Sequence, residues 1–286
     1  MMGEGATEGK HKMRGGGHCP RSLLFLPASM PERLPKASAS MADAIIIDLE
    51  DAVAEDQKDK ARANTIDMLA NRTSVHPQIV VRVNSLSRIC GLKDIIALAN
   101  ASANPDYILL PKVEDPGQLE LVSRMLADGN SKASLGALIE SSRGVAAAPE
   151  IARADCELSF LMFGAADYAA DLGQQVGHYR PSYAAATVVN AAACGGIVAI
   201  DSPFFDIADS EGLASECVKG KATGFYGKAA IHPRQVAPIK SCFRPTPEEL
   251  ARAKRILRST AGEVGVLEGK MVDRAMVRWA RNILAG

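Results

Sequence analysis

Eight short apolar runs recur along the chain, with starts about 22 to 38 residues apart. They begin at residues 22, 44, 78, 107, 134, 158, 196 and 227. The runs are continuous rather than alternating, as in strands buried on both faces, and Ala-rich stretches with helical spacing separate them. Eight alternating strand and helix units predict an α/β protein with a (β/α)8 TIM barrel. A doubly wound open sheet is the alternative, but "FLPASMPER" lacks the glycine fingerprint expected after its first strand.

Nearly every run ends in a polar or special residue. These residues are Pro27, Asp48 with Glu50, Arg82 with Asn84, Lys112, Glu140, Gly164 leading to Asp167, Asp201 and His232. In a barrel the carboxyl ends of all eight strands open onto one face, where the chemistry gathers. We therefore expect a pocket on that face, lined by acids that a cation could neutralise.

The barrel is predicted to occupy residues 21–245. Residues 1–20 are polar and Gly-rich without an apolar core, so we expect a flexible leader and not a signal peptide. Residues 246–286 predict a C-terminal helical extension or lid, with Thr246 as N-cap and a Gly-broken turn or hairpin before a final amphipathic helix. Such extensions often cover an active site or bind a neighbouring subunit. On pattern alone, Asp273 is the N-cap of the final helix.

Composition excludes several classes of protein. Lys plus Arg and Asp plus Glu both number 33 and aromatic residues make up 5%, which argues against nucleic-acid binding. No apolar run reaches the roughly 18 residues of a membrane span. The six cysteines form no C-x-x-C pair, so we interpret them as reduced thiols of a cytoplasmic protein.

Glu140 and Asp167 are the candidate metal ligands. They follow consecutive predicted strands, the fifth and the sixth, whose ends are neighbours in a barrel. Mg²⁺ is commonly held by one or two carboxylates and keeps its other positions for water and substrate oxygens. The alternative is a helix-capping Asp and a surface Glu.

Arg82 lies within a buried run and must be paired. It either forms a structural ion pair with Asp48 or Glu50, or offers a planar fork to a substrate carboxylate or enolate oxygen. Lys112 presents the same choice, with Glu114 or Glu140 as structural partner, and a Schiff-base role suits the acid cluster less well.

Asp48, Glu50 and Asp51 could hold metal-bound waters. The alternative is helix capping by Asp51 and simple exposure to solvent. His232 is more often structural in such a position.

These segments resemble the HpcH/HpaI aldolase family, in particular its citrate lyase beta-subunit-like branch of acyl-CoA lyases. The segments that carry the resemblance, in order, are "RSLLFLPASMPER", "ADAIIIDLEDAV", "VVRVN", "ILLPKVE", "ALIESSRGV", "FGAADYAADLG", "AIDSPFFDIADSEGL", "GFYGKAAIHPRQV", "RPTPEELARAKRIL" and "GKMVDRAM". They span residues 21 to about 280.

The resemblance implies a TIM barrel with Mg²⁺ bound by Glu140 and Asp167, and a substrate contact for Arg82. It implies that the backbone of Gly164 and Ala165 cradles a keto-acid carboxylate. It places coenzyme A near the residues Arg21, Ala28 and Lys36. It also implies a homotrimer in which the C-terminal extension crosses to a neighbouring subunit and Asp273 acts there as the acid or base.

The implied reaction is the retro-Claisen cleavage of a 3-hydroxyacyl-CoA to acetyl-CoA, or a homologue of it, and a 2-keto acid. Citryl-, citramalyl-, malyl- and methylmalyl-CoA all fit, since a few pocket contacts decide between them. An acyl-CoA thioesterase on the same scaffold is one alternative. A non-catalytic beta-like subunit of a lyase complex is another, because Ala28, Met30, Ala166 and Tyr226 depart from the family pattern.

Overall fold

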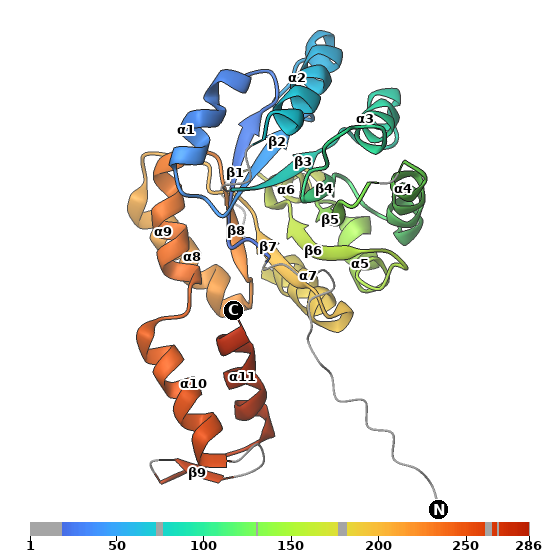
Figure 1. The fold of residues 1–286 in the computed structure, drawn as a ribbon. Coiled ribbons are helices and arrows are strands. Elements are labelled where there is room, and N and C mark those ends of the chain that lie inside the picture. Colours follow the sequence, from blue (N-terminus) through green and yellow to red (C-terminus); the bar gives the residue numbers. More distant parts are fainter. Residues whose placement is uncertain are drawn as a thin grey trace, which may run out of the picture. The chain divides into compact units, whose positions relative to one another are not determined.

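Eight parallel strands close into a barrel in chain order, with β8 beside β1 (Figure 1). The computed structural model describes residues 19–72, 77–129, 131–176, 182–260, 265–267 and 269–285. The strands are β1 (Ser22–Pro27), β2 (Ala44–Asp48), β3 (Gln78–Arg82), β4 (Tyr107–Leu110), β5 (Ser134–Ile139), β6 (Leu158–Phe163), β7 (Val198–Asp201) and β8 (Gly227–Ala230). Each lies within one predicted run, so the barrel is confirmed and the open sheet is excluded.

A helical segment follows every strand and covers the outside of the barrel (Figure 1). These segments are η1 (Pro31–Arg33), α1 (Leu34–Ala39), η2 (Glu55–Gln57), α2 (Lys58–Ala70), α3 (Ile89–Ala99), α4 (Pro116–Asp128), α5 (Ser142–Ile151), α6 (Ala165–Asp171), α7 (Ser182–Gly195), α8 (Ser210–Thr223) and α9 (Pro233–Phe243). Two helices follow β6, and the first of them, α6, begins two residues after the strand ends.

The strands are apolar throughout because each lies between two apolar layers. One layer fills the barrel and includes Leu23, Ala44, Ile46, Val80, Leu109, Leu138, Phe160, Met162 and Ile200. The larger layer packs between the strands and the surrounding helices. Gly136 makes room for Phe160, since a Cβ at that glycine would lie 2.4 Å from the phenyl ring. Because successive side chains alternate between the two layers, position along a strand decides which residues face the inside.

The chain divides into two compact units, with the boundary between Phe243 and Arg244. The C-terminal unit contains α10 (Pro247–Thr260), an antiparallel hairpin of β9 (Gly265–Leu267) and β10 (Lys270–Val272), and α11 (Arg274–Ala285). Its own core consists of Ala253, Ile256, Val272, Val277 and Ala280. The predicted cap is confirmed: the Thr246 hydroxyl accepts from the Glu249 amide, and the Glu249 carboxylate accepts from the Thr246 amide.

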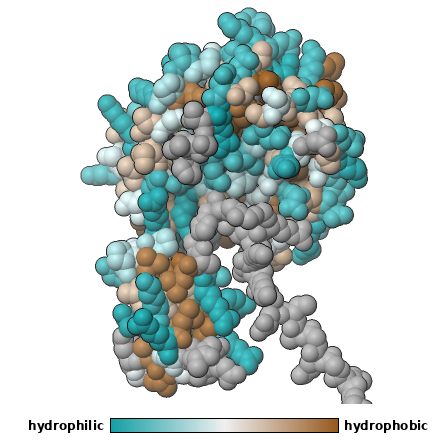
Figure 2. Space-filling model, viewed as in Figure 1, coloured by the Kyte–Doolittle hydropathy of each residue, from teal (hydrophilic) through white to brown (hydrophobic). Residues whose placement is uncertain are grey.

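The C-terminal unit exposes a set of large apolar side chains. They are Val266, Met271, Met276, Trp279 and Leu284. Figure 2 shows brown, hydrophobic surface on this unit. In the part of the chain that the structure describes, no helix is both long and apolar enough to cross a membrane. All six cysteines are free. The predicted leader falls almost wholly on residues 1–18, outside the described residues.

Candidate active site

The strand register brings three predicted polar residues to one mouth of the barrel. Asp48, Arg82 and Glu140 each lie two positions beyond a residue that fills the barrel interior. They therefore point inward at the carboxyl ends of β2, β3 and β5. Asp48 and Arg82 are direct partners across the β2–β3 ladder. Their exposures are 2% for Asp48, 8% for Arg82 and 3% for Glu140, so these charges must be neutralised locally.

Arg82 is held by carboxylates on three sides. Its Nε and Nη2 each donate to one oxygen of Asp48 at 2.7 Å, a bidentate pair that fixes the plane of the guanidinium. Its Nη1 lies 3.0 Å from Glu50 and 3.4 Å from Asp51. Burial lowers the pKa of Arg82, but the hydrogen bonds and charges of these acids outweigh burial and raise the pKa above its usual value. The ion pair that the sequence left as an alternative is therefore present.

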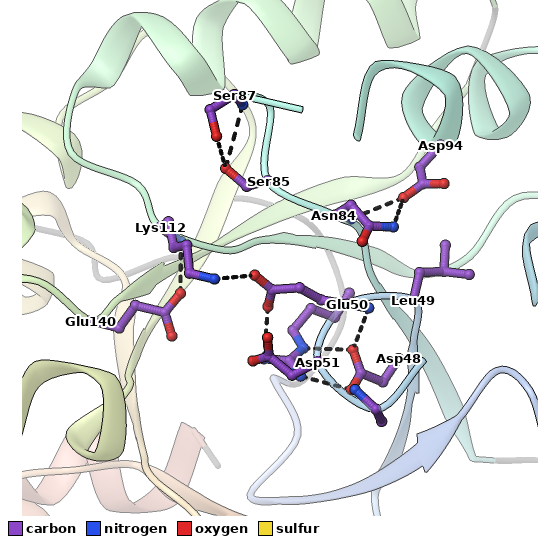
Figure 3. Close-up of polar contacts among 12 residues, drawn as sticks. Asp48, Leu49, Glu50, Asp51, Asn84, Ser85, Ser87, Asp94, Lys112 and Glu140 are labelled. Carbon is purple, nitrogen blue, oxygen red and sulfur yellow. Dashed lines mark hydrogen bonds and ion pairs between the residues drawn. The ribbon is translucent and has the colours of Figure 1, made fainter. Parts of the chain in front are cut away.

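Glu50 is the buried acid at the centre of this group (Figure 3). Its Oε1 accepts from the Lys112 ammonium at 2.8 Å. Its Oε2 lies near Arg82 but outside hydrogen-bonding geometry, and among the described residues this oxygen has no hydrogen-bond donor. Burial raises the pKa of Glu50, against the lowering effect of Arg82 and Lys112. The loop that carries Glu50 is held by buried Lys58, whose ammonium donates to the carbonyls of Leu49 and Glu50.

Glu140 adjoins this group through the Lys112 main chain. The Lys112 amide donates to Glu140 Oε1 at 2.8 Å, so Lys112 lies between Glu140 and Glu50 (Figure 3). Burial, together with the negative charges of Glu50 and Asp167, raises the pKa of Glu140 to about 8. Arg82 and the Lys112 amide oppose this shift without cancelling it. Glu140 is thus a buried acid with too little positive charge around it.

Asp167 lies on the first turn of α6 and is exposed. Its charge acts on Glu140, which identifies the two predicted ligands as electrostatic neighbours. Gly164, the N-cap of α6, makes this approach possible, since a Cβ there would lie 2.5 Å from the Cβ of Glu140 and 2.8 Å from its Oε2. Oε2 of Glu140 therefore faces the backbone from which α6 begins.

These acids fit a divalent cation. Five carboxylates face two cationic side chains: Asp48, Glu50, Asp51, Glu140 and Asp167 against Arg82 and Lys112. The excess negative charge and the raised pKa of Glu140 indicate a missing positive charge. Oε2 of Glu50 also has no hydrogen-bond donor among the described residues, although it lies 3.0 Å from Arg82 Nη1. Within the described residues, no three acid, histidine or cysteine side chains form a complete protein metal site. Two carboxylates with open positions suit Mg²⁺ better than Zn²⁺.

The predicted cradle for a substrate carboxylate, Gly164 and Ala165, has both amides engaged within the protein. The Gly164 amide donates to the Ile139 carbonyl at 2.9 Å. The Ala165 amide donates to Ser202 Oγ at 3.0 Å, and that hydroxyl donates to the Phe163 carbonyl at 2.7 Å. Ser202 thereby ties the end of β7 to the start of α6. This cradle stays a prediction.

The three residues suggested for coenzyme A do not lie together. Ala28, directly after β1, is fully buried, and Lys36 is exposed on α1. Arg21 precedes β1 and so lies at the opposite end of that strand from the acids. There its guanidinium donates to the carbonyls of Tyr226 and Phe243 and stacks 3.9 Å from the Tyr226 ring. This corrects the grouping, because Arg21 supports the amino end of the barrel and does not adjoin the candidate site.

Asp273 caps α11, as the sequence predicts: its Oδ1 accepts from the Met276 amide at 2.9 Å. His232 takes a local role, with its Nδ1 accepting from the Arg234 amide. Lys58 and Ser202 are the positioning residues that the sequence did not indicate. A lysine at a helix start and a serine after a strand are common, and their partners are known only once the barrel is closed.

The chain is similar to proteins of a known family over most of its length. The family profile described as HpcH/HpaI aldolase/citrate lyase matches residues 21–233. The chain is 37% identical over 277 residues to a (3S)-malyl-CoA thioesterase of Cereibacter sphaeroides, covering 93% of each chain. It is 33% identical over 296 residues to an L-malyl-CoA/beta-methylmalyl-CoA lyase of Rhodobacter capsulatus, covering 92% of this chain and 93% of that protein.

A solved structure extends the likeness to the fold. CitE of Mycobacterium tuberculosis, in complex with magnesium, acetoacetate and coenzyme A, is 34% identical with a TM-score of 0.75. The match covers 93% of this chain and 97% of that chain.

Proposed function

Because the chain belongs to the HpcH/HpaI aldolase/citrate lyase family, we propose that it is a Mg²⁺-dependent carbon–carbon lyase. It would cleave a 3-hydroxy dicarboxylic or tricarboxylic acyl-CoA to a 2-keto acid and acetyl-CoA, or propionyl-CoA where C2 carries a methyl group. Citryl-, citramalyl-, malyl- and methylmalyl-CoA are the candidate substrates. The observation that carries the proposal is Glu140 at the carboxyl face of the barrel. It is buried, and its pKa is raised by burial and by the negative charges of Glu50 and Asp167.

Glu140 and Asp167 would hold the metal, and the oxygen of Glu140 that faces Gly164 is the one open to it. When bound, Mg²⁺ supplies Lewis acidity, which lowers the pKa of a substrate hydroxyl and polarises the carbonyl that forms from it. Asp48, Glu50 and Asp51 would accept hydrogen bonds from metal-bound waters. This arrangement is supported by Oε2 of Glu50, which is buried and accepts no hydrogen bond among the described residues.

Arg82 is the proposed contact for the thioester oxygen. In the cleavage, the C2–C3 bond breaks, its electron pair moves to the thioester as an enolate, and the hydroxyl proton passes to a water molecule as the keto acid forms. The bidentate pair with Asp48 fixes the guanidinium before substrate binds, so no reorganisation is needed as charge develops. Asp273 of a neighbouring subunit would then protonate C2 to give acetyl-CoA.

A product assay tests this proposal. The purified protein is incubated with each of the four thioesters, once with Mg²⁺ and once with a chelator, and acetyl-CoA, propionyl-CoA, free CoA and keto acid are quantified. We expect one thioester to yield keto acid and an equal amount of acetyl-CoA, or of propionyl-CoA for methylmalyl-CoA, only with Mg²⁺. Glu140→Gln should remove this activity. Glu50→Ala should weaken both Mg²⁺ binding and turnover, and an unchanged variant would exclude the water-holding role.

The same assay decides between the lyase and a thioesterase. The second reaction is favoured by the likeness to a protein named (3S)-malyl-CoA thioesterase. Hydrolysis would release free CoA with an intact hydroxy acid, and no acetyl-CoA. If the protein alone turns over none of the four thioesters while binding Mg²⁺, a subunit role within a larger lyase is the better reading.

A further inference from the structure

Lys112 has an unusual backbone for a lysine. Its φ is +53°, in the left-handed region that side-chain-bearing residues rarely adopt, and apart from Met41 it is the only such non-glycine residue among those described. Both sequence neighbours hold the backbone of Lys112 in this conformation. Pro111 precedes it, and buried Val113 follows it with an amide that donates to the Leu138 carbonyl. Strained residues held in this way gather at functional sites.

The left-handed backbone lets one residue reach two carboxylates in opposite directions. The Lys112 amide donates to Glu140 Oε1 at 2.8 Å, and its ammonium donates to Glu50 Oε1, also at 2.8 Å (Figure 3). One acid is contacted by the main chain and the other by the side chain. The angle φ sets how the side chain of Lys112 lies relative to its own amide, so the left-handed value allows both contacts at once.

The two contacts have the same consequence for each acid. Lys112 occupies one oxygen of Glu140 and one oxygen of Glu50. Lys112 leaves the second oxygen, Oε2, of each acid for another partner. Oε2 of Glu50 lies 3.0 Å from Arg82 Nη1 but accepts no hydrogen bond among the described residues. Oε2 of Glu140 is also the oxygen beside Gly164, where the backbone that carries Asp167 begins.

We propose that Lys112 is a positioning residue that selects which oxygen of Glu140 and of Glu50 faces the metal site. It acts through its strained main chain on the first acid and through its ammonium on the second. The inference rests on the proposed magnesium site, but not on which thioester is cleaved. A glycine here would be less strained, but it would lose the ammonium that holds Glu50 and would fix the amide that holds Glu140 less firmly.

Two substitutions separate the contacts. Lys112→Gly removes the strain and the ammonium together, whereas Lys112→Met removes the ammonium and keeps the restricted backbone. Lys112→Arg keeps a cation for Glu50. Lys93→Met, on α3, is a matched control, because Lys93 is exposed and its one ion pair among the described residues is with Asp59 at 3.7 Å. Mg²⁺ affinity is measured by titration calorimetry, stability by thermal unfolding without metal, and kcat and KM on the active thioester.

We expect Lys112→Gly to bind Mg²⁺ about tenfold more weakly, while its unfolding midpoint equals or exceeds that of the wild type. Lys112→Met should stay within about threefold of wild-type Mg²⁺ affinity but lose about tenfold in kcat, and Lys112→Arg should recover part of that loss. Lys93→Met should match the wild type throughout.

The proposal is overturned if Lys112→Gly binds Mg²⁺ as tightly as the wild type, or if it loses stability and affinity together, as a merely structural residue would. Wild-type protein that binds no Mg²⁺ refutes this inference and the metal site together. Wild-type protein that binds Mg²⁺ but cleaves no thioester refutes the proposed reaction alone. In that case the Mg²⁺ titrations still decide the role of Lys112.

Discussion

Glu140 is buried beside other acids, and its pKa of about 8 determines how protons and Mg²⁺ compete for it. Below that pH the carboxyl group holds a proton that must leave before the metal binds. We therefore expect the Kd for Mg²⁺ to fall by up to about tenfold per pH unit from pH 6 to pH 8 and then to level off. Titration calorimetry of the substrate-free protein across this range measures it.

The release of that proton on Mg²⁺ binding can be measured directly and tests the same prediction independently. Calorimetry in two buffers of different ionisation enthalpy gives the number of protons released, which should approach one near pH 7. Glu140→Gln should lose both the binding and the proton release. A Mg²⁺ affinity that stays constant between pH 6 and pH 8 would mean that Mg²⁺ binding does not displace a proton from Glu140.

Asp48 and Glu50 differ in what they stabilise, although they face the same arginine. Asp48 makes both short bonds to buried Arg82, so Asp48→Asn removes its main anionic partner and should cost about 3 kcal/mol in the free energy of unfolding. Glu50→Gln should cost about 1 kcal/mol, because its other partner, Lys112, is half exposed and can turn to water. Urea unfolding of the metal-free proteins measures both values. Equal losses of stability would contradict the different roles of Asp48 and Glu50.

At the scale of single elements, the start of α6 is fitted to β5 at Gly164. Its φ is −101°, so the glycine is needed for space and not for backbone conformation. In Gly164→Ala, the added methyl group would collide with the Glu140 side chain. We expect a loss of about 1–3 kcal/mol in stability and at least about tenfold in Mg²⁺ affinity, since Glu140 must turn away.

Gly173→Ala is the control for this substitution, because it strains the backbone just after the same helix without touching the site. Gly173 has φ +67° with nothing within 4 Å of an added Cβ. It should cost about 1 kcal/mol in stability and leave Mg²⁺ affinity unchanged. If both variants bind Mg²⁺ like the wild type, the close packing of Gly164 against Glu140 has no part in the metal site.

The strands and the barrel could be predicted because burial on both faces leaves a plain apolar signal, which eight runs repeat. The polar residues at the strand ends could be assigned to one face because the carboxyl ends of all strands in a parallel barrel open onto the same side. The left-handed Lys112 could not be predicted, because lysine carries no local signal for positive φ and only closure of the barrel imposes it. Arg21 was misplaced by resemblance, although its position before the first strand already assigns it to the other end.

At the scale of the whole molecule, the C-terminal unit has its own small core and a set of exposed apolar side chains. Val266 and Met271, on the β9–β10 hairpin, are 68% and 67% exposed. Apolar surface of this kind often marks a contact with another protein surface. It is consistent with the proposed homotrimer, in which this unit brings Asp273 to the site of a neighbouring subunit.

Shared sites of that kind can be tested by mixing two inactive full-length variants. Glu140→Gln lacks a metal ligand, and Asp273→Asn keeps the cap of α11 while lacking the proposed acid. If each site takes Glu140 from one subunit and Asp273 from the next, random mixed oligomers rebuild intact sites, and about a quarter of wild-type activity should return. The mixture is dissociated and reassembled before acetyl-CoA production is measured.

Each variant carried through the same procedure alone is the control, and neither should gain activity. A mixture that stays inactive, although size-exclusion chromatography with light scattering shows mixed oligomers, would mean that one chain supplies both residues. Asp273→Asn that is fully active alone would remove Asp273 from the chemistry and leave it only as the cap of α11. Recovered activity in the mixture requires that the exposed C-terminal unit of one chain reaches the barrel of another.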